Sequence, residues 1–156
     1  GGSAGQGGAG GMGGAGGMGG SPPECSYAAP TDCAGAVQLC TVKGDDGSDL
    51  CTAEGTTSKW LKVHVDEASG LINQLSFSAS LQSPPGMLFD LYVRRDDCNG
   101  SAQMGGGNPE SVEQTWGDTI LHDDGAWVIL EVRYFTGNFC GPAAQWTLTV
   151  KGHTNP

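Results

Sequence analysis

Residues 59 to 67 read KWLKVHVDE, and this stretch decides the fold. Three aliphatic residues, Leu61, Val63 and Val65, alternate there with polar ones. In an extended chain successive side chains point to opposite faces, so a period of two places these three on one side. The stretch therefore predicts a β-strand with one buried face and one face open to solvent.

The same alternation recurs along the rest of the chain. Leu71 to Leu81 sets apolar residues against serines, and the residues SPPG at 83 to 86 then force a turn. Helical spacing does not persist beyond two turns. Further strands are expected at Met87–Arg95, Thr119–Leu121, Trp127–Phe135 and Gln145–Lys151. Short strands separated by Gly, Pro, Asn and Asp are typical of an all-β fold, here an antiparallel β-sandwich or jelly roll.

Cysteine usage predicts that disulfides hold this sandwich together. The six cysteines are Cys25, Cys33, Cys40, Cys51, Cys98 and Cys140. Their number is even, and neither a CxxC pair nor a zinc-type Cys/His spacing occurs, so we expect three disulfides formed in an oxidising compartment. Cys98 and Cys140 both flank predicted strands and are expected to pair. The other four would then join the start of the domain as Cys25–Cys33 and Cys40–Cys51.

The first 24 residues form a glycine-rich arm with a period of three. Every third residue from Gly2 to Gly20 is glycine, and the triplets QGG, AGG, MGG, AGG and MGG follow one another. A polyproline II type helix has three residues per turn, so this period places the side chains on one edge and leaves two bare backbone faces. The residues expected to carry assembly are Gly8, Gly11, Met12, Gly14, Gly17, Met18 and Gly20.

Energetics leave two interpretations of the arm open. Ordering about twenty residues costs roughly 20 to 40 kcal/mol of backbone entropy, while each hydrogen bond returns about 0.5 to 1.5 kcal/mol. A single arm is therefore a flexible spacer, whereas several arms together could form a polyglycine II bundle. The absence of proline before Pro22 argues against a collagen triple helix. We divide the chain into the arm (1–24), a cysteine-rich first segment of the domain (25–54) and the sandwich (55–156).

Charge and hydropathy exclude two classes of partner. The formal net charge is −10, with 7 basic and 17 acidic residues, so nucleic acid is not an expected partner. The sequence contains no apolar run near the roughly 20 residues of a membrane span. An extracellular or cell-surface location is expected instead.

The sequence offers no catalytic motif, and we expect no enzyme. His64, His122 and His153 are far apart, no serine lies in a GxSxG turn, and paired cysteines supply no thiol. No organic cofactor is expected.

Two weaker binding hypotheses remain. Acidic loops could hold calcium, which prefers carboxylate oxygens, although their spacing matches no calcium-loop motif. The first candidates are Asp96, Asp97, Asp123 and Asp124. Trp116, expected in a loop beside Gly117, is the tryptophan that we predict to contact a ligand.

Several motifs resemble a known family. DLYV at Asp90–Val93 and QWTLTV at Gln145–Val150 are similar to strands of the bacterial pre-peptidase C-terminal domain. Together with the glycine-rich leader, TSKWLKV, WGDTI and DDGAWVILEV, they are also similar to uncharacterised surface proteins and lipoproteins of myxobacteria. The resemblance covers about residues 55 to 152. It implies a secreted, non-catalytic β-sandwich, in a family where some members bind polysaccharide or collagen and some bind calcium.

Three functional hypotheses follow. The first is a secreted structural protein whose arm binds copies of itself and builds an extracellular filament. The second is a surface-tethered module that binds polysaccharide or a matrix protein, with the arm as a spacer. The third is ice binding by an ordered array of glycine helices.

Overall fold

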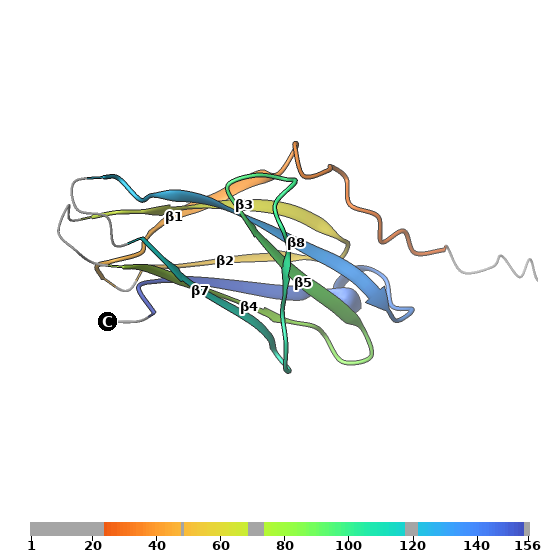
Figure 1. Ribbon diagram of the computed structural model, residues 1–156. Helices are drawn as coiled ribbons and strands as arrows, with labels where there is room; N and C mark the ends of the chain where they lie inside the picture. The colour runs from red at the N-terminus through yellow and green to blue at the C-terminus, as the bar shows by residue number, and fades with distance from the viewer. Residues whose placement is uncertain (1–23, 48, 69–73, 118–121, 155–156) are drawn as a thin grey trace, which may run out of the picture.

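The computed structural model describes residues 24–47, 49–68, 74–117 and 122–154. Two features predicted from the sequence lie outside these ranges: the arm through residue 23 and the strand at 119–121. The described residues form nine strands in two layers (Figure 1). The strands are β1 (Val37–Lys43), β2 (Leu50–Gly55), β3 (Lys59–Asp66), β4 (Leu75–Gln82), β5 (Leu88–Arg95), β6 (Gln103–Met104), β7 (Glu110–Trp116), β8 (Ala126–Thr136) and β9 (Trp146–Gly152). A short 3-10 turn, η1 (Gly141–Ala144), precedes β9. The described residues contain no helix with the length and hydropathy of a membrane span.

The predicted β-sandwich is confirmed. One sheet has the strand order β1-β3-β8-β5-β6 and the other β2-β9-β4-β7. The ladders are antiparallel, as predicted, except that β1 and β3 run parallel. The reason is that β2 lies in the opposite sheet, so the chain leaves and re-enters the first sheet in the same direction. Residues 25–54 thus supply β1 and all of β2 except its last residue, Gly55.

The two inner sheet faces form the core. Leu61, Val63 and Val65, the residues that predicted a strand at 59–67, are at most 2% exposed and point inward from β3. Trp146 is fully buried, and its Nε1–H donates to the carbonyl oxygen of Thr57 at 2.8 Å. A buried indole needs such a partner. The core therefore follows from the period of two, and its largest side chain is Trp146 at the start of β9.

The predicted strands lie within a few residues of the observed ones, but the edge strands were not predicted. The stretch expected at 71–81 contains β4, and those at 87–95, 127–135 and 145–151 correspond to β5, β8 and β9. The strands β1, β2, β6 and β7, which are the edge strands of the two sheets, were missed. Edge strands bury few large residues: β7 has only Val112 fully buried, and β2 turns the small residues Cys51 and Ala53 inward. Their apolar periodicity is accordingly weak.

All six cysteines form disulfides, as predicted, but two of the three expected pairs are wrong. Cys40–Cys51 is confirmed, whereas Cys25 bonds to Cys140 and Cys33 to Cys98. Cys98 follows the end of β5, and Cys140 follows the end of β8. Because β5 and β8 are antiparallel, these two cysteines lie at opposite ends of the sandwich and cannot pair.

Candidate functional site: an aromatic face on the five-stranded sheet

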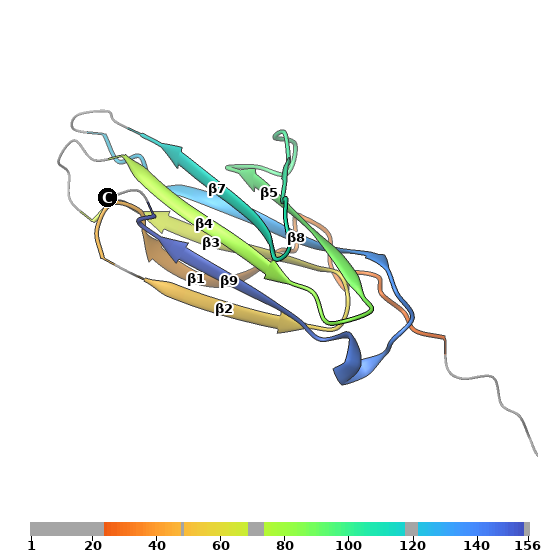
Figure 2. The same ribbon diagram turned by 90° about the horizontal axis from the view of Figure 1, so that it is seen from below.

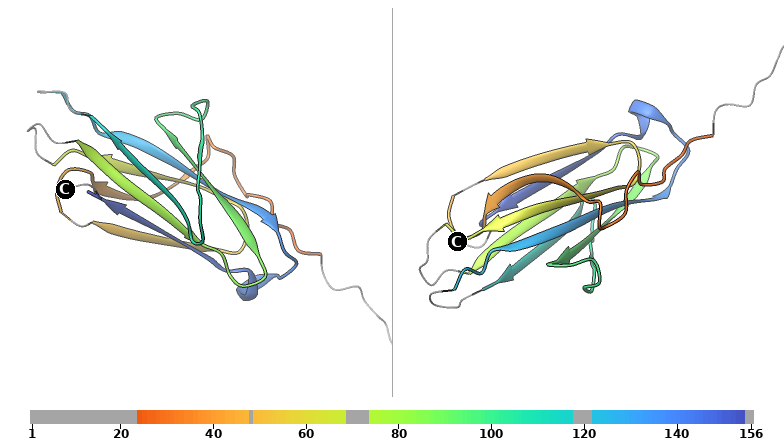
Figure 3. Two further views of the ribbon diagram at one scale, coloured as in Figure 1. Left: turned by 60° about the horizontal axis from the view of Figure 1, so that its bottom comes forward. Right: turned by 90° about the horizontal axis from the view of Figure 1, so that it is seen from above.

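The outer face of the five-stranded sheet carries aromatic and cationic side chains. The strands β3, β8 and β5 lie side by side in this sheet, which faces the viewer in the right-hand view of Figure 3, and their ladders pair the outward residues. One row is Trp60, Glu131 and Tyr92, the next is Lys62, Ile129 and Arg94, and the third begins with His64 and Trp127. Three of the 7 basic residues of an acidic protein, Lys62, Arg94 and Arg133, form cation–π contacts on this face.

Glu131 organises the middle of this face. It is 6% exposed, and its carboxylate pairs with Arg94 at 3.1 Å and with Arg133 at 2.7 Å. The Arg94 guanidinium lies 5.1 Å from the centre of the Trp60 ring, and that of Arg133 lies 4.4 Å from the Tyr92 ring. A buried carboxylate needs such partners because desolvation is costly. The network therefore holds a rigid surface in which guanidinium groups lie over the Trp60 and Tyr92 rings.

Trp127 is the more exposed of the two tryptophans on this face, the other being Trp60. It lies near the start of β8 and is 37% exposed. His64 meets it edge on with ring centres 4.9 Å apart, and Lys62 Nζ lies 5.0 Å from its ring centre. The lysine side chain is flexible, unlike the guanidinium groups held by Glu131. Trp127 thus offers a ring whose position is fixed by β-sheet backbone.

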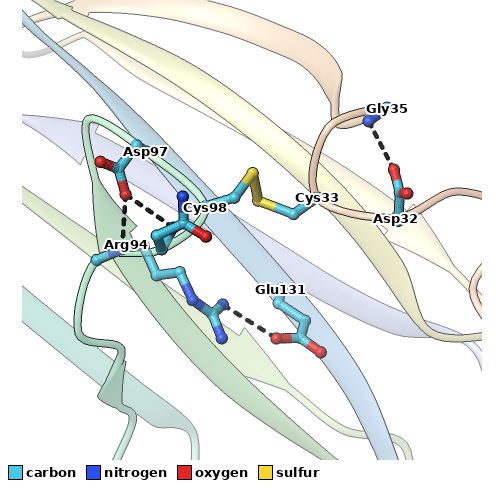
Figure 4. Close-up of a disulfide and its surroundings, with 9 residues drawn as sticks. Asp32, Cys33, Gly35, Arg94, Asp97, Cys98 and Glu131 are labelled. Atoms are coloured by element: carbon cyan, nitrogen blue, oxygen red, sulfur yellow. Dashed lines mark hydrogen bonds and ion pairs between the residues drawn. A yellow bond between two sulfur atoms is a disulfide. The ribbon is translucent and has the colours of Figure 1, made fainter.

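A hollow of about 310 Å³ adjoins Trp127. Its lining comprises Cys33, Ala34, Ala36, Lys62, Asp96, Asp97, Cys98, Trp127 and Ile129. The Cys33–Cys98 disulfide joins the loop that carries Asp32 and Gly35 to the loop that carries Asp97 (Figure 4). One wall of the hollow is therefore covalently fixed to the end of β5.

Both carboxylates at the hollow are positioned by local backbone geometry. Asp97 Oδ1 accepts hydrogen bonds from the backbone N–H groups of Asn99 at 2.7 Å and Gly100 at 2.6 Å. Asp96 has a φ of 72°, and its N–H donates to the carbonyl oxygen of Trp127 at 2.8 Å. Asp and Asn tolerate this left-handed conformation better than most residues. The loop thus presents oxygens beside the Trp127 ring.

The Trp127 ring, the two carboxylates and the Lys62 ammonium group together suit a ligand with one apolar face and a polar edge. A tryptophan ring covers the apolar face, while carboxylates and an ammonium group hydrogen-bond the edge. A pyranose ring has this division, with C–H groups on its face and hydroxyls around its rim.

The four aspartates predicted to bind calcium do not gather at one point. Asp123 accepts a hydrogen bond from the Gly125 N–H at 2.9 Å, and the N–H of Asp124 donates to Glu67 at 3.0 Å. Asp96 and Asp97 instead line the hollow. Within the described ranges, no group of three or more His, Cys, Asp or Glu side chains is arranged to hold a metal ion. Calcium binding stays a prediction without a defined site.

Trp116 is not in a loop, contrary to the prediction. It is the last residue of β7, its Nε1–H donates to the Asp124 carbonyl oxygen at 2.9 Å, and its ring packs edge on against Phe77. Sequence reasoning singled out this tryptophan and not Trp127. The signal was present in AWVILEVR: Glu131 and Arg133 share the parity of Trp127, which places all three on the outer face.

Comparisons of the chain with family models, with curated proteins and with solved structures find no match.

Proposed function

We propose that this protein is an extracellular, non-catalytic module that binds a saccharide at the Trp127 hollow. The observation that carries the proposal is the exposed Trp127 ring beside a hollow with fixed carboxylates and a lysine. Sugars stack on such rings and hydrogen-bond with such groups. The three disulfides support an oxidising compartment. The resemblance to pre-peptidase C-terminal domains also agrees with polysaccharide binding.

Geometry favours a role in binding rather than in catalysis. Asp97 already accepts two backbone hydrogen bonds, and Asp96 is held by the same loop and contacts Arg95 at 3.3 Å. Carboxylates committed in this way orient a ligand but have little freedom to exchange protons with it. The arm would then act as a spacer between the module and its attachment.

Affinity electrophoresis against a panel of soluble polysaccharides tests the proposal. The Trp127→Ala variant should lose on the order of tenfold or more in affinity, as truncation of a central aromatic contact does. Phe135→Ala is the matched control, because Phe135 is an exposed aromatic residue of the same strand and is 65% exposed. Equal retention by both variants, or no retardation of the wild-type protein by any polysaccharide, would contradict the proposal.

Assembly through the glycine arm is the second candidate, favoured by the period of three in residues 2 to 20. The first described residues are anchored at one end of the sandwich, by the Cys25–Cys140 bond and by a hydrogen bond from the Tyr27 hydroxyl to the Phe139 carbonyl oxygen at 2.8 Å. An extended arm of 21 residues would reach roughly 65 Å. That length is enough to reach a neighbouring copy.

A further inference from the structure

A second hollow lies on the opposite side of the sandwich, on the outer face of the four-stranded sheet. Figure 2 views the molecule from this side. The hollow measures about 550 Å³ and is lined by Asp49, Leu50, Ser78, Glu113, Lys151, Gly152, His153 and Thr154. It shares no lining residue with the Trp127 hollow.

Strand register sets two opposite charges across this hollow. Ser78 of β4 pairs with Lys151 of β9 on one side and with Glu113 of β7 on the other. Neighbouring strands are about 4.8 Å apart, so the backbones of Lys151 and Glu113 are separated by roughly 10 Å. Neither side chain forms an ion pair with any residue that the structure describes. An ammonium group and a carboxylate therefore flank a short serine hydroxyl.

The end of the hollow is formed by His153 and Thr154. The backbone N–H groups of His153 and Thr154 donate to the carbonyl oxygen and the hydroxyl of Ser76, both at 2.9 Å. The side-chain atoms His153 Nδ1 and Thr154 Oγ1 are buried and have no hydrogen-bond partner among the described residues. Both residues line the hollow, and buried polar atoms are nearly always hydrogen-bonded, so polar groups at this end are available to a ligand after a small side-chain rotation.

We propose that this hollow binds a small zwitterion of the size of an amino acid or dipeptide. The carboxylate of the ligand contacts Lys151, and its ammonium group contacts Glu113. Leu50, which is 55% exposed, offers an apolar surface to the ligand side chain. A ligand with a single charge would pair with either Lys151 or Glu113 and would leave the other side chain without an opposite charge. A zwitterion matches both walls at once.

Titration of ¹⁵N-labelled protein with the dipeptide Leu-Gly, followed by NMR, tests this site. The backbone amides of Ser78, Lys151 and His153 should shift, while that of Trp127 should not. N-acetyl-Leu-Gly lacks the ammonium group and Leu-Gly-amide lacks the carboxylate. Each should bind on the order of tenfold more weakly, because each has lost one charge-assisted contact.

Two variants assign the contacts. Glu113→Gln should abolish the preference for Leu-Gly over its N-acetyl analogue and keep the preference over the amide, and Lys151→Met should do the reverse. Glu54→Gln, which alters an exposed glutamate of the same sheet, is the matched control and should keep both preferences. Equal affinity of the wild-type protein for all three peptides, or no shift at millimolar concentration, would overturn the proposal. Saccharide binding at Trp127 is measured separately and is unaffected by either result.

Discussion

At the scale of single residues, Glu110 replaces a missing strand partner. The two-residue strand β6 pairs with β5 only at Tyr92 and Val93, and the Glu110 carboxylate accepts a hydrogen bond from the Leu91 N–H at 2.7 Å. Burial raises the pKa of the Glu110 carboxyl above its ordinary value of 4.5; the Leu91 hydrogen bond lowers it, and Asp90 raises it further. Glu110 therefore holds its proton more tightly in the folded protein than in the unfolded chain.

This raised pKa predicts a pH-dependent stability. Stabilisation by protonated Glu110 is fully present below pH 4.5 and is lost as the pH rises through the raised folded pKa. Glu110→Gln keeps a neutral acceptor for Leu91 at every pH. The variant should therefore gain stability relative to the wild type between about pH 4 and about pH 7. Urea unfolding midpoints at the two pH values measure this, with Glu54→Gln as a control for loss of a surface charge. Parallel pH profiles for the wild type and Glu110→Gln would refute the expectation.

Gly152 lies where β9 passes β1. A Cβ at this position would overlap the carbonyl oxygen of Lys43 and lie 3.1 Å from Val42 Cβ. Gly152→Ala should therefore destabilise the protein by about 1 to 3 kcal/mol, as overpacking does. Gly106→Ala is the control, since a Cβ there meets nothing within 4 Å, and it should change stability by less than about 0.5 kcal/mol. Guanidinium unfolding measures the free energy of unfolding of both variants. Similar losses for both would show that the close contact between Gly152 and Lys43 does not determine the cost of an added Cβ.

At the scale of elements, disulfides connect parts of the sandwich that the ladders leave separate. β1 and β2 are edge strands of different sheets, and Cys40–Cys51 joins them. Cys25–Cys140 joins the start of the described chain to the loop before η1. The sequence separations are 11 and 115 residues.

Loop length predicts how much each bond stabilises the fold. In the chain-entropy account, closing a loop near 15 residues contributes about 3 kcal/mol and one near 100 residues about 4.7 kcal/mol. Replacing Cys25 and Cys140 by alanine should therefore cost more unfolding free energy than replacing Cys40 and Cys51. Denaturant unfolding of the two double variants is the measurement. A larger loss for the Cys40–Cys51 pair would show that joining the sheet edges matters more than loop length.

At the scale of the whole molecule, the two outer faces differ in chemistry. The five-stranded sheet displays aromatic rings and guanidinium groups, whereas a row across the other sheet consists of Thr52, Thr149, Ser80 and Ser111. Alternating side chains bury one face of each strand, so the chemistry of the outward side chains is not constrained by the core. The two proposed binding surfaces lie on these two chemically different faces.

Electron microscopy of the whole chain with and without residues 1 to 21 tests assembly by the arm. If arms associate, filaments or oligomers should be present in the full chain and absent after truncation. The reason is that a glycine helix makes no internal hydrogen bonds and needs neighbouring arms packed against its bare backbone faces. Replacing Gly11, Gly14 and Gly17 by alanine should have the same effect as truncation. Monomers in every sample would reject assembly and leave the spacer role.

The sequence by itself determined the strands of the core and the use of all six cysteines. A period of two is a local property, so KWLKVHVDE specifies its buried face without knowledge of its neighbours. Only the tertiary structure decided which strands share a sheet, which cysteines pair, and that Trp127 and not Trp116 borders the hollow. These depend on contacts between residues distant in sequence: Cys33 reaches Cys98 across 65 residues, and Lys151 faces Glu113 only because β4 lies between their strands.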